Sequence, residues 1–355
     1  MMPTGAMRKI LDLARWAPSG DNTQVWRFEV LGPDHVLVHA WDTRAECVYD
    51  LDGHPSQISI GTLLETIAIA ASAHGLRADV RRRPDRPVES LQFDVRLVPD
   101  AGIQPSPLID AITRRTVQRR PMRTRALTAL EKEALEQSLG KGYTLTWLES
   151  AGERLRAARL MYANAALRLS MPEAFEVHRR IIHWNASRSP DKVPDRALGV
   201  DPGTLRLMQW AMASWRRMSM VNRMLGTWAP RLQMDFIPAL ACAAHFVLKA
   251  RRAPASVDDY IDAGRALQRF WLTLTKLGLF MQPEMTPLIF SKYVRERRPF
   301  TQTGRLHGVA ARLEREARAL IFTDALHPVY MGRVGAGPAP TARSERLPLE
   351  QLLIP

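Results

Sequence analysis

The first hundred residues alternate between apolar spacings typical of helices and of strands. An amphipathic run at residues 6–16 predicts a helix, and two apolar runs, WRFEVLG and HVLVHAW, predict a hairpin across GPD. The apolar stretch 59–76 is long enough for a buried helix with Gly75 at its C-terminal cap. LQFDVRLVPD then alternates as a further strand. This order predicts one α+β unit.

A related order returns after residue 107. The runs LIDAITRRT and TALEKEALEQSL predict helices before the strand-like YTLTWLES, and Thr128 and Glu131 have capping-box spacing. The apolar run 264–279 matches 61–76 at a constant offset of 203 residues, with Gly61 aligned to Gly264. We expect a strand after each of these helices, FDVRLVP in one case and RALIFT in the other. The order predicts two copies of the unit, residues 1–106 and 107–355.

A segment rich in Met and Trp, at about 155–248, interrupts the second copy. Met and Trp at helical spacings usually indicate helix packing, yet these adaptable side chains also suit a cover over a flat ligand. Both interpretations stay open, and we expect a helical lid here. The apolar run FIPALACAAHFVL at the end of this segment is too short to span a bilayer.

Composition adds a basic charge to this picture. The chain has 355 residues, 46% of them hydrophobic, and a formal net charge of +14. Arginines recur in every segment instead of one aromatic-interleaved stretch, which favours a solvated surface over a nucleic-acid site. Two cysteines, Cys47 and Cys242, allow neither a disulfide framework nor a zinc site. The N-terminal residues lack a signal-peptide pattern, so we expect a cytoplasmic protein with no metal.

The stretch ARWAPSGDNTQVWRFEV stops the first helix abruptly, because Pro18, Gly20 and Asn22 fall within five positions. A loop rich in small and amide side chains presents backbone N–H groups and the donors and acceptors of Asn22 and Gln24. Such a loop suits the edge of a flat heterocycle. The alternative is a capped turn in which Ser19, Asp21 or Asn22 satisfies local backbone groups.

Two further stretches carry arginine. In AITRRTVQRRP, guanidinium groups could grip a phosphate through paired hydrogen bonds, and the Thr116 hydroxyl adds a donor. A solvated helix face is the alternative for this run. The tail MGRVGAGPAPTARSERLPLEQLLIP carries Arg343, Ser344 and Arg346. Its apolar end predicts that the tail docks on the protein and is not disordered.

Taken in order, these stretches resemble the FMN-dependent nitroreductase family. That family shows an Arg-Arg-Ser-like motif, an Ala-Pro-Ser…Asn-x-Gln-Pro-Trp loop, a Gly-Leu…Pro-Glu-Gly segment and a C-terminal Ser-x-Arg-x-Pro-Leu stretch. The counterparts here are Arg114-Arg115-Thr116, Ala17-Pro18-Ser19…Asn22-Thr23-Gln24-Val25-Trp26, Gly278-Leu279…Pro283-Glu284-Met285 and Ser344-Glu345-Arg346-Leu347-Pro348-Leu349. The arginine motif lies in the middle of the chain, which is similar to the Acg-like branch, where one chain holds two nitroreductase-like halves.

This resemblance implies an α+β, nitroreductase-like fold of two pseudo-repeated halves, each a mainly antiparallel sheet packed by helices, with the lid inserted. It implies one FMN per chain between the halves, because the loop occurs only in the first half and the arginine motif only in the second. The implied FMN contacts are Pro18, Ser19, Asn22, Gln24, Arg114, Arg115, Thr116, Gln118, Pro283, Glu284, Met285, Arg343, Ser344 and Arg346.

The implied activity is that of an FMN-dependent oxidoreductase that takes hydride from NAD(P)H and reduces a small nitro, quinone or similar acceptor. No catalytic side chain is assigned; the backbone at Glu284 and Met285 would bond the flavin N5, and Met285 replaces the family's glycine. Alternatives are an FMN-sequestering protein without turnover and an FMN-dependent dehydrogenase of a biosynthetic intermediate. We expect a monomer that imitates the dimer, or else a homodimer, without nucleic-acid or membrane partners.

Overall fold

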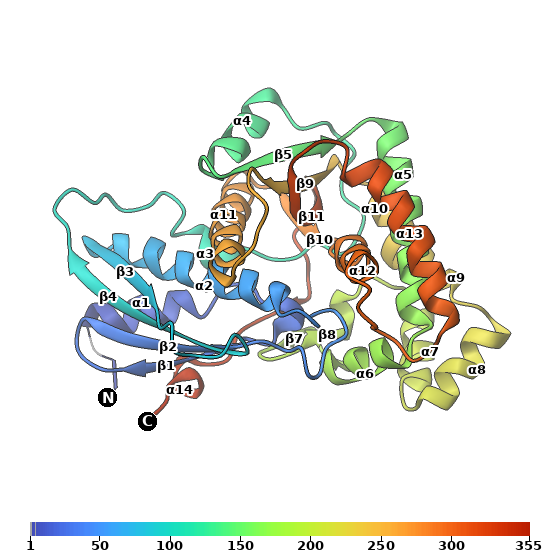
Figure 1. Ribbon diagram of the computed structural model, residues 1–355, viewed down its shortest axis with the longest axis horizontal. Coiled ribbons are helices and arrows are strands. Elements are labelled where there is room, and N and C mark those ends of the chain that lie inside the picture. The colour runs from blue at the N-terminus through green and yellow to red at the C-terminus, as the bar shows by residue number, and fades with distance from the viewer. Residues whose placement is uncertain (1, 4) are drawn as a thin grey trace.

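The computed structural model describes residues 2–3 and 5–355, and two four-stranded antiparallel sheets organise the fold (Figure 1). The first sheet has the order β1-β2-β4-β3, from β1 (Trp26–Val30), β2 (His35–Trp41), β3 (Leu76–Arg82) and β4 (Ser90–Pro99). The second has the order β10-β11-β9-β5, from β5 (Tyr143–Leu148), β9 (Ala244–Ala250), β10 (Phe280–Pro283) and β11 (His327–Gly335). Mixed helices and antiparallel sheets make this an α+β protein, as expected from the sequence.

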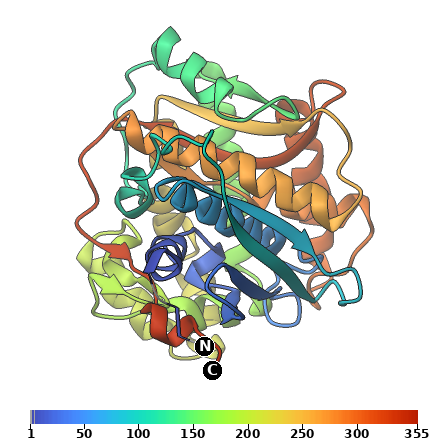
Figure 2. The ribbon, with the colours of Figure 1, turned by 90° about the vertical axis from the view of Figure 1, so that its left-hand side faces the viewer.

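Two long helices, α2 (His54–Ser72) and α11 (Val257–Lys276), lie side by side between the sheets (Figures 1 and 2). Each helix follows the second strand of its sheet along the chain and ends before a glycine with positive φ, Gly75 or Gly278. The predicted hairpin, both apolar helices and the capping box at α4 (Ala129–Gln137) are all present. The core of the first sheet also includes α1 (Gly5–Ala14).

The crossing of α2 and α11 depends on two glycines. A Cβ atom at Gly61 would overlap the carbonyl oxygen of Ile261, and a Cβ atom at Gly264 would overlap that of Ile58. The two contacts are reciprocal, because each partner differs from its counterpart by the same 203 residues that relate Gly61 to Gly264. Only glycine lets the two backbones approach this closely.

Polar contacts along the two helices repeat this reciprocity. The Glu65 carboxylate lies 2.9 Å from a guanidinium nitrogen of Arg269, and the Gln268 amide donates to the Thr66 hydroxyl at 2.9 Å. The residue 203 positions after Glu65 is Gln268, and the residue 203 positions before Arg269 is Thr66. The same pairing therefore occurs twice across the crossing, as at the self-complementary interface of a symmetric dimer.

The expected strand RALIFT is wrong. Those residues form the end of α13 (Arg305–Ile321), because Leu306, Ala310, Leu313, Ala317 and Leu320 recur at helical spacing and are buried. The strand that follows α11 is the short β10, and α12 (Thr286–Arg295) and α13 separate it from β11. In the first half, the more polar β3 precedes the predicted strand, which is β4.

The long insertion, which we call the lid, comprises residues 149–243 between β5 and β9. The expected segment, about 155–248, overlaps it, but its last five residues belong to β9. The lid contains α5 (Ala151–Leu169), α6 (Pro172–Ile181), α7 (Pro202–Ala211), α8 (Trp215–Met224), α9 (Trp228–Arg231) and α10 (Ile237–Leu240). Its short strands are β6 (Ile182–His183), β7 (Arg188–Ser189) and β8 (Val193–Pro194), and it also contains the 3-10 helix η2 (Asp195–Ala197) and the π-helix η3 (Leu232–Phe236).

The C-terminal tail links all three regions. It pairs with the lid through β12 (Arg343–Ser344) and β7, and α14 (Leu349–Leu352) then packs its buried Leu349 and Leu352 on the first sheet. The Ile354 N–H donates to the Phe28 carbonyl of β1 at 2.8 Å. The two ends of the chain lie close together at this sheet (Figures 1 and 2). The tail is docked, as its apolar end predicts.

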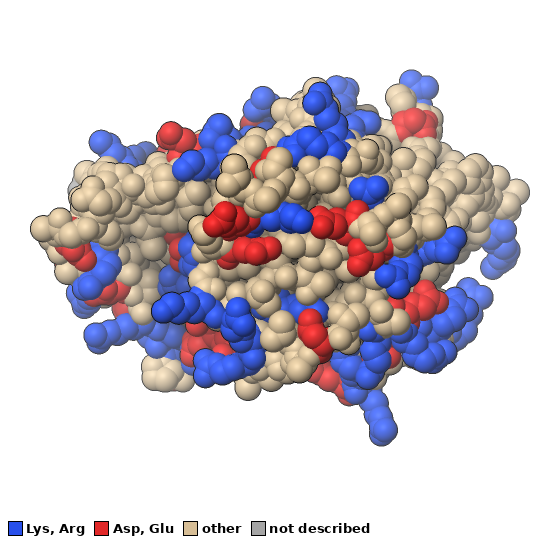
Figure 3. All heavy atoms as spheres, turned by 90° about the horizontal axis from the view of Figure 1, so that it is seen from above, with Lys and Arg blue, Asp and Glu red and all other residues tan. Residues whose placement is uncertain are grey.

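The surface charge is dispersed on the face seen in Figure 3, where basic side chains are scattered among acidic ones. That distribution fits the solvated surface expected from the arginine spacing. Within the described residues, no helix combines the length and hydropathy needed to cross a bilayer.

Candidate functional site

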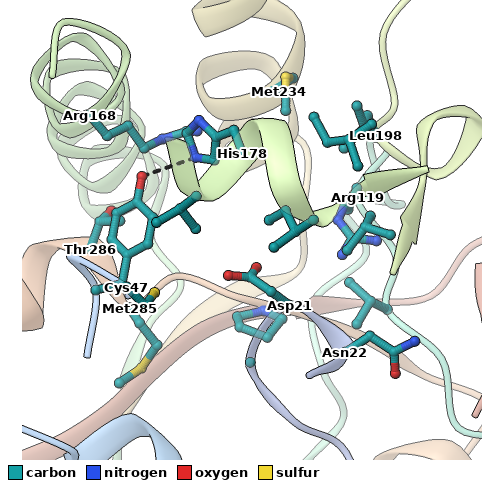
Figure 4. A pocket seen from close by; sticks show the side chains of 18 of the residues that line it. Asp21, Asn22, Cys47, Arg119, Arg168, His178, Leu198, Met234, Met285 and Thr286 are labelled. Carbon is teal, nitrogen blue, oxygen red and sulfur yellow. Dashed lines mark hydrogen bonds between the residues drawn. The ribbon is translucent and has the colours of Figure 1, made fainter. Parts of the chain in front are cut away.

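A cavity of about 980 Å³ lies where the first loop, α2, the β10–α12 junction, the tail and the lid meet (Figure 4). Its volume is at the upper end of the ~300–1,000 Å³ typical of small-molecule sites. The walls are mostly apolar, with a few polar groups from separate parts of the chain. The cavity is therefore large enough for a cofactor and a second molecule.

The loop after α1 enters this cavity in a strained conformation. Asp21, Asn22 and Gln24 all have positive φ, near 51°, 65° and 49°, although none is glycine. The loop is fixed to α2, where the Thr62 hydroxyl donates to the Pro18 carbonyl at 2.9 Å. Non-glycine residues persist in this region only when their surroundings hold them there, and such residues cluster at functional sites.

Amide side chains tie the loop to the lid and the tail. The Asn22 and Gln24 amide groups donate to the Pro190 carbonyl at 3.2 and 2.9 Å, and the Gln24 Oε1 accepts from the Leu347 N–H at 2.9 Å. The capped-turn alternative holds for Ser19, whose Oγ accepts from the Gln24 N–H. Asn22 lines the cavity, and its Oδ1 is buried without a partner among the described residues.

Three arginines surround the start of the loop. Arg115 Nη2 donates to the Trp16 carbonyl at 3.0 Å, and Arg346 Nε donates to the Ala17 carbonyl at 2.9 Å. Arg343 Nη2 donates to the Arg115 carbonyl at 3.2 Å. Arg115 also stacks on Trp271, with its guanidinium carbon 4.6 Å from the ring centre. The second half and the tail therefore supply a cluster of positive charge at the first half's loop.

This cluster has few protein partners for its charge. Within the described residues, no carboxylate lies within 4 Å of Arg115, Arg343 or Arg346, and the buried Nε atoms of Arg115 and Arg343 have no hydrogen-bond partner. Burial, followed by Arg346 and Arg343, lowers the pKa of Arg115, and burial with Arg343 and Arg15 lowers the pKa of Arg346 to about 9. Buried, uncompensated cations are costly, and a bound anion would relieve that cost.

The opposite side of the cavity is built by the junction of β10 and α12. The Glu284 N–H donates to the Met331 carbonyl at 2.9 Å, so it is already used within the sheet. The N–H of Met285, at the start of α12, has no acceptor among the described residues. Of the two backbone groups expected to meet a flavin, only Met285 therefore keeps a free donor.

A cluster of buried ionic side chains stabilises this junction. The Glu284 carboxylate lies 2.6 Å from His245 Nδ1 of β9 and 3.5 Å from Arg333 Nε of β11. Burial alone would lower the pKa of His245, but Glu284 and Cys242 raise it to about 10. The imidazole is therefore charged at neutral pH. Arg333 also donates to the carbonyls of Pro238 and Arg119, which connects the junction to the arginine-rich segment.

His178 and Cys47, on the lid side of the cavity, are uncharged at neutral pH. Burial and the neighbouring Arg168 lower the pKa of His178 to about 3, and the neutral ring is hydrogen-bonded through Nε2 to the Tyr49 hydroxyl at 3.0 Å (Figure 4). Burial also raises the pKa of the Cys47 thiol to about 12. Arg168 itself forms a buried pair with Asp235 at 2.9 Å. This wall therefore carries no thiolate or imidazolium at neutral pH.

Asp21 is the carboxyl group that stands in the middle of the cavity (Figure 4). Burial raises its pKa, against the lowering influence of Arg119 and Arg168. No hydrogen-bond donor of the described residues pairs with its oxygens. A carboxyl group in this setting can hold a proton at a pH where ordinary aspartates have lost theirs.

The structure brings most of the predicted contact residues together at this cavity. Its lining includes Pro18, Ser19, Asn22, Arg115, Pro283, Glu284, Met285, Ser344 and Arg346. Five others lie outside the lining: Gln24, Arg114, Thr116, Gln118 and Arg343. Arg114 is exposed and bonds the Asp110 carbonyl, while Gln24 and Gln118 are buried and bond backbone groups.

Several groups at the site escape sequence reasoning. Asp21 belongs to the loop that carries the motif, and its raised pKa comes first from burial, which the sequence alone does not indicate. Cys47, Tyr49 and His178 carry no motif. Within the described residues, no group of three or more His, Cys, Asp or Glu side chains is arranged to hold a metal ion.

Comparisons with known proteins give weak similarities. No family model matches the chain. The chain is 25% identical over 346 residues to the uncharacterized protein MT1398 of Mycobacterium tuberculosis (strain CDC 1551 / Oshkosh), covering 93% of this chain but 46% of that relative. It therefore spans less than half the length of the curated relative that it matches.

Two solved structures are similar at low score. One is a nitroreductase-like family protein from Bacillus cereus, with a TM-score of 0.34, 13% identity, and coverage of 69% of this chain and 94% of that one. The other is the FMN-dependent nitroreductase NfnB from Mycobacterium smegmatis in complex with NADPH, with a TM-score of 0.35, 15% identity, and coverage of 68% and 94%.

Proposed function

We propose that this chain binds one FMN in the cavity and acts as an oxidoreductase of the nitroreductase type. The observation that carries the proposal is the cluster of buried Arg115 and Arg346 with half-buried Arg343, none of which has a carboxylate partner among the described residues. Each guanidinium has five N–H donors, and Arg115 gives only one of them to the protein. Paired guanidinium N–H donors suit a phosphate group.

The rest of the cavity suits the ring of the same molecule. The unpaired Oδ1 of Asn22 can accept a hydrogen bond from an N–H on the edge of a heterocycle. The free N–H of Met285 can donate to a ring nitrogen. The two groups lie on different elements that both line the cavity, as the motif resemblance leads us to expect. In this proposal, Gln24 and Gln118 hold the loop and the tail in place and do not contact the flavin.

The proposal includes one flavin per chain because the chain is a pseudo-dimer of two halves, residues 1–106 and 107–355. The matching strand orders and the reciprocal contacts at Gly61 and Gly264 support it. The strained loop precedes β1, whereas the segment before β5 is the short SLGKG, at residues 138–142. The arginine cluster belongs to the second half and the tail. Only one set of loop and arginines is therefore complete.

Bound FMN would accept two electrons from a nicotinamide such as NAD(P)H and pass them to an organic acceptor. The chain's own task is to hold the cofactor, exclude water and supply a proton. Asp21 is the group placed for the last task, since its carboxyl faces the cavity and its pKa is raised. The apolar walls favour an aromatic or quinone-like acceptor.

Flavin retention tests the proposal. The purified chain is reconstituted with FMN, and the bound flavin is measured by absorption after gel filtration. Arg115→Ala and Arg346→Ala should each weaken FMN affinity by about 100-fold, because each removes charge-assisted hydrogen bonds worth about 2–3 kcal/mol. Arg114→Ala is the matched control and should bind like the original chain, since Arg114 is exposed. Equal loss in all three variants would contradict the assignment.

A second measurement separates an enzyme from a sequestering protein. Anaerobic addition of NADH or NADPH should bleach the absorption of bound FMN, and a quinone or nitroaromatic should restore it. Bound FMN that no nicotinamide reduces would leave FMN binding intact but remove the oxidoreductase part of the proposal.

A further inference from the structure

The outer surface of the lid is both apolar and basic. Eight of the thirteen large hydrophobic side chains exposed by the described residues fall between Leu207 and Leu240. Residues 202–234 contain five arginines and no aspartate or glutamate. We call the exposed side chains of α7, α8 and the 225–228 turn the lid face. It differs from the mixed charge seen elsewhere on the surface (Figure 3).

The lid face follows one side of each helix. On α8, the exposed residues are Arg216, Arg217, Met220, Arg223 and Met224, which fall within about a third of a helical turn. On α7, Arg206, Leu207 and Trp210 have the same spacing. Helices with Lys or Arg beside large apolar side chains are typical of segments that lie in the interface of a bilayer.

The arginines of the lid face have no acidic partners. None of Arg206, Arg216, Arg217 and Arg223 has a carboxylate within 4 Å among the described residues, while Arg179 and Arg180 of the neighbouring α6 are both paired. Arg217 instead stacks on Trp210, 5.2 Å from the ring centre. Unpaired arginines around exposed Met and Trp indicate a partner that is anionic and apolar at once.

The cavity opens through the lid face. Leu207, Leu225 and Trp228 line the cavity and are also 41%, 56% and 58% exposed. The opposite side of α8 lines the cavity through Met218, Val221 and Asn222. One helix therefore separates the lid face from the cavity, and the three shared side chains form a mouth between them.

We propose that the lid face docks on an anionic lipid bilayer. Met224 and Trp228 insert among the lipids at the surface, and Arg216, Arg217 and Arg223 contact the headgroups. Each arginine near an anionic surface strengthens binding about fivefold, and apolar insertion adds a second, independent contribution. A second copy of the chain is a poor occupant, because a symmetric contact would bring arginine against arginine. The docked mouth then admits lipophilic molecules from the bilayer.

The sequence led us to expect no membrane partner, since its longest apolar run cannot span a bilayer. A protein can dock on a bilayer without a membrane-spanning segment. The lid face is recognised by the exposure of its apolar residues, and the sequence alone does not distinguish such residues from ones packed inside a lid. The proposal does not depend on a bound flavin, because it rests on the outer side of α7 and α8. Its failure and that of the proposed function are therefore distinguishable.

Vesicle co-sedimentation tests the docking. The full chain should bind vesicles of phosphatidylglycerol and phosphatidylcholine at low ionic strength, and should not bind vesicles of phosphatidylcholine alone. The variant Arg216→Glu with Arg217→Glu and Arg223→Glu should weaken binding by about 100-fold or more. Met224→Ser, which removes a side chain that is 75% exposed, should weaken binding by about fivefold to tenfold at unchanged charge.

The matched control reverses three exposed arginines far from the lid: Arg81→Glu with Arg86→Glu and Arg252→Glu. The control variant has the same net charge as the lid variant and should keep binding within about threefold. Circular dichroism and thermal unfolding show whether both variants fold. Absence of binding to anionic vesicles, equal loss in both triple variants, or binding of the lid face to an acidic protein with none to lipid would overturn the proposal.

Discussion

The two sheets share a strand order but differ in what covers them. In β1 and β4 the buried side chains are all apolar and alternate with exposed or half-buried ones, so one face of these strands remains near solvent. In β9, every residue is buried, and His245 and Lys249 lie among them. In the second sheet, the corresponding face is covered by the lid and α13. Because burial makes unpaired charges costly, the charged groups of this sheet are paired: His245 lies 2.6 Å from Glu284, and Lys249 lies 2.8 Å from Asp324.

The two sheets also differ in what they contribute to the cavity. The first sheet presents a strained loop, and the second supplies the arginines, the β10–α12 junction and the lid. The two contributions meet at a single cavity. The predictions below test where the halves are equivalent and where they differ.

The largest effect is expected where the halves are equivalent. Gly61→Ala and Gly264→Ala should each lower the free energy of unfolding by about 4 kcal/mol or more, because each Cβ meets the backbone of the opposite helix. The two losses should be similar, as measured by urea unfolding. Gly308→Ala is the control, since its helical site on α13 is open and should gain about 0.5–1 kcal/mol. A mild effect at one of the two glycines would break the equivalence.

The next effect contrasts a His–Glu pair in each sheet. His245→Gln should cost about 3 kcal/mol, because Glu284 and His245 are buried together, whereas His39→Gln should cost less than about 1 kcal/mol. His39 and Glu29 lie 2.7 Å apart but are about one third exposed.

The pH dependence of this difference has a definite sign. The folded pKa of His245 is raised to about 10 from an ordinary value near 6.5. Its contribution to stability is therefore complete below about pH 6.5 and is lost as pH rises toward 10. The gap in unfolding free energy between the original chain and His245→Gln should shrink over that window. A gap that widens with pH would contradict the ion pair.

A smaller effect concerns the loop that only the first half possesses. Asp21→Asn should slow acceptor reduction by about tenfold while flavin content stays the same, because it removes the proposed proton donor. Since the pKa of Asp21 is raised, the original rate should fall as pH rises through that value, and the variant should lack this limb. Asp191→Asn, an exposed carboxyl at the cavity rim, serves as the control. An unchanged pH profile in stopped-flow traces would remove Asp21 from the reaction.

Much of the secondary structure could be predicted from the sequence. Hairpin residues, glycine caps and the capping box act locally, so the pattern alone places them. The sequence also shows the match of Gly61 to Gly264, but it does not show that these two glycines mark the contact between α2 and α11. RALIFT failed because a short apolar run does not distinguish the end of a helix from a strand.

The site could be predicted only as a set of motifs. Whether Arg114 or Arg115 enters the cavity depends on the rotation of α3 (Ala111–Arg114), a single turn whose phase the sequence leaves undetermined. The group of His245, Glu284 and Arg333 requires the pairing of three strands that are distant in the chain. The environment of Asp21 requires the lid. Long-range contacts of these kinds carry no local signal.

Flavin stoichiometry tests whether the chain holds a single composite flavin site. The chain is saturated with FMN, freed of excess flavin, and assayed for flavin absorbance against protein concentration from amino-acid analysis. One loop and one arginine cluster predict one FMN per chain. Two FMN per chain would show that the second half builds a site of its own, and no retained FMN would contradict the assignment of the cavity.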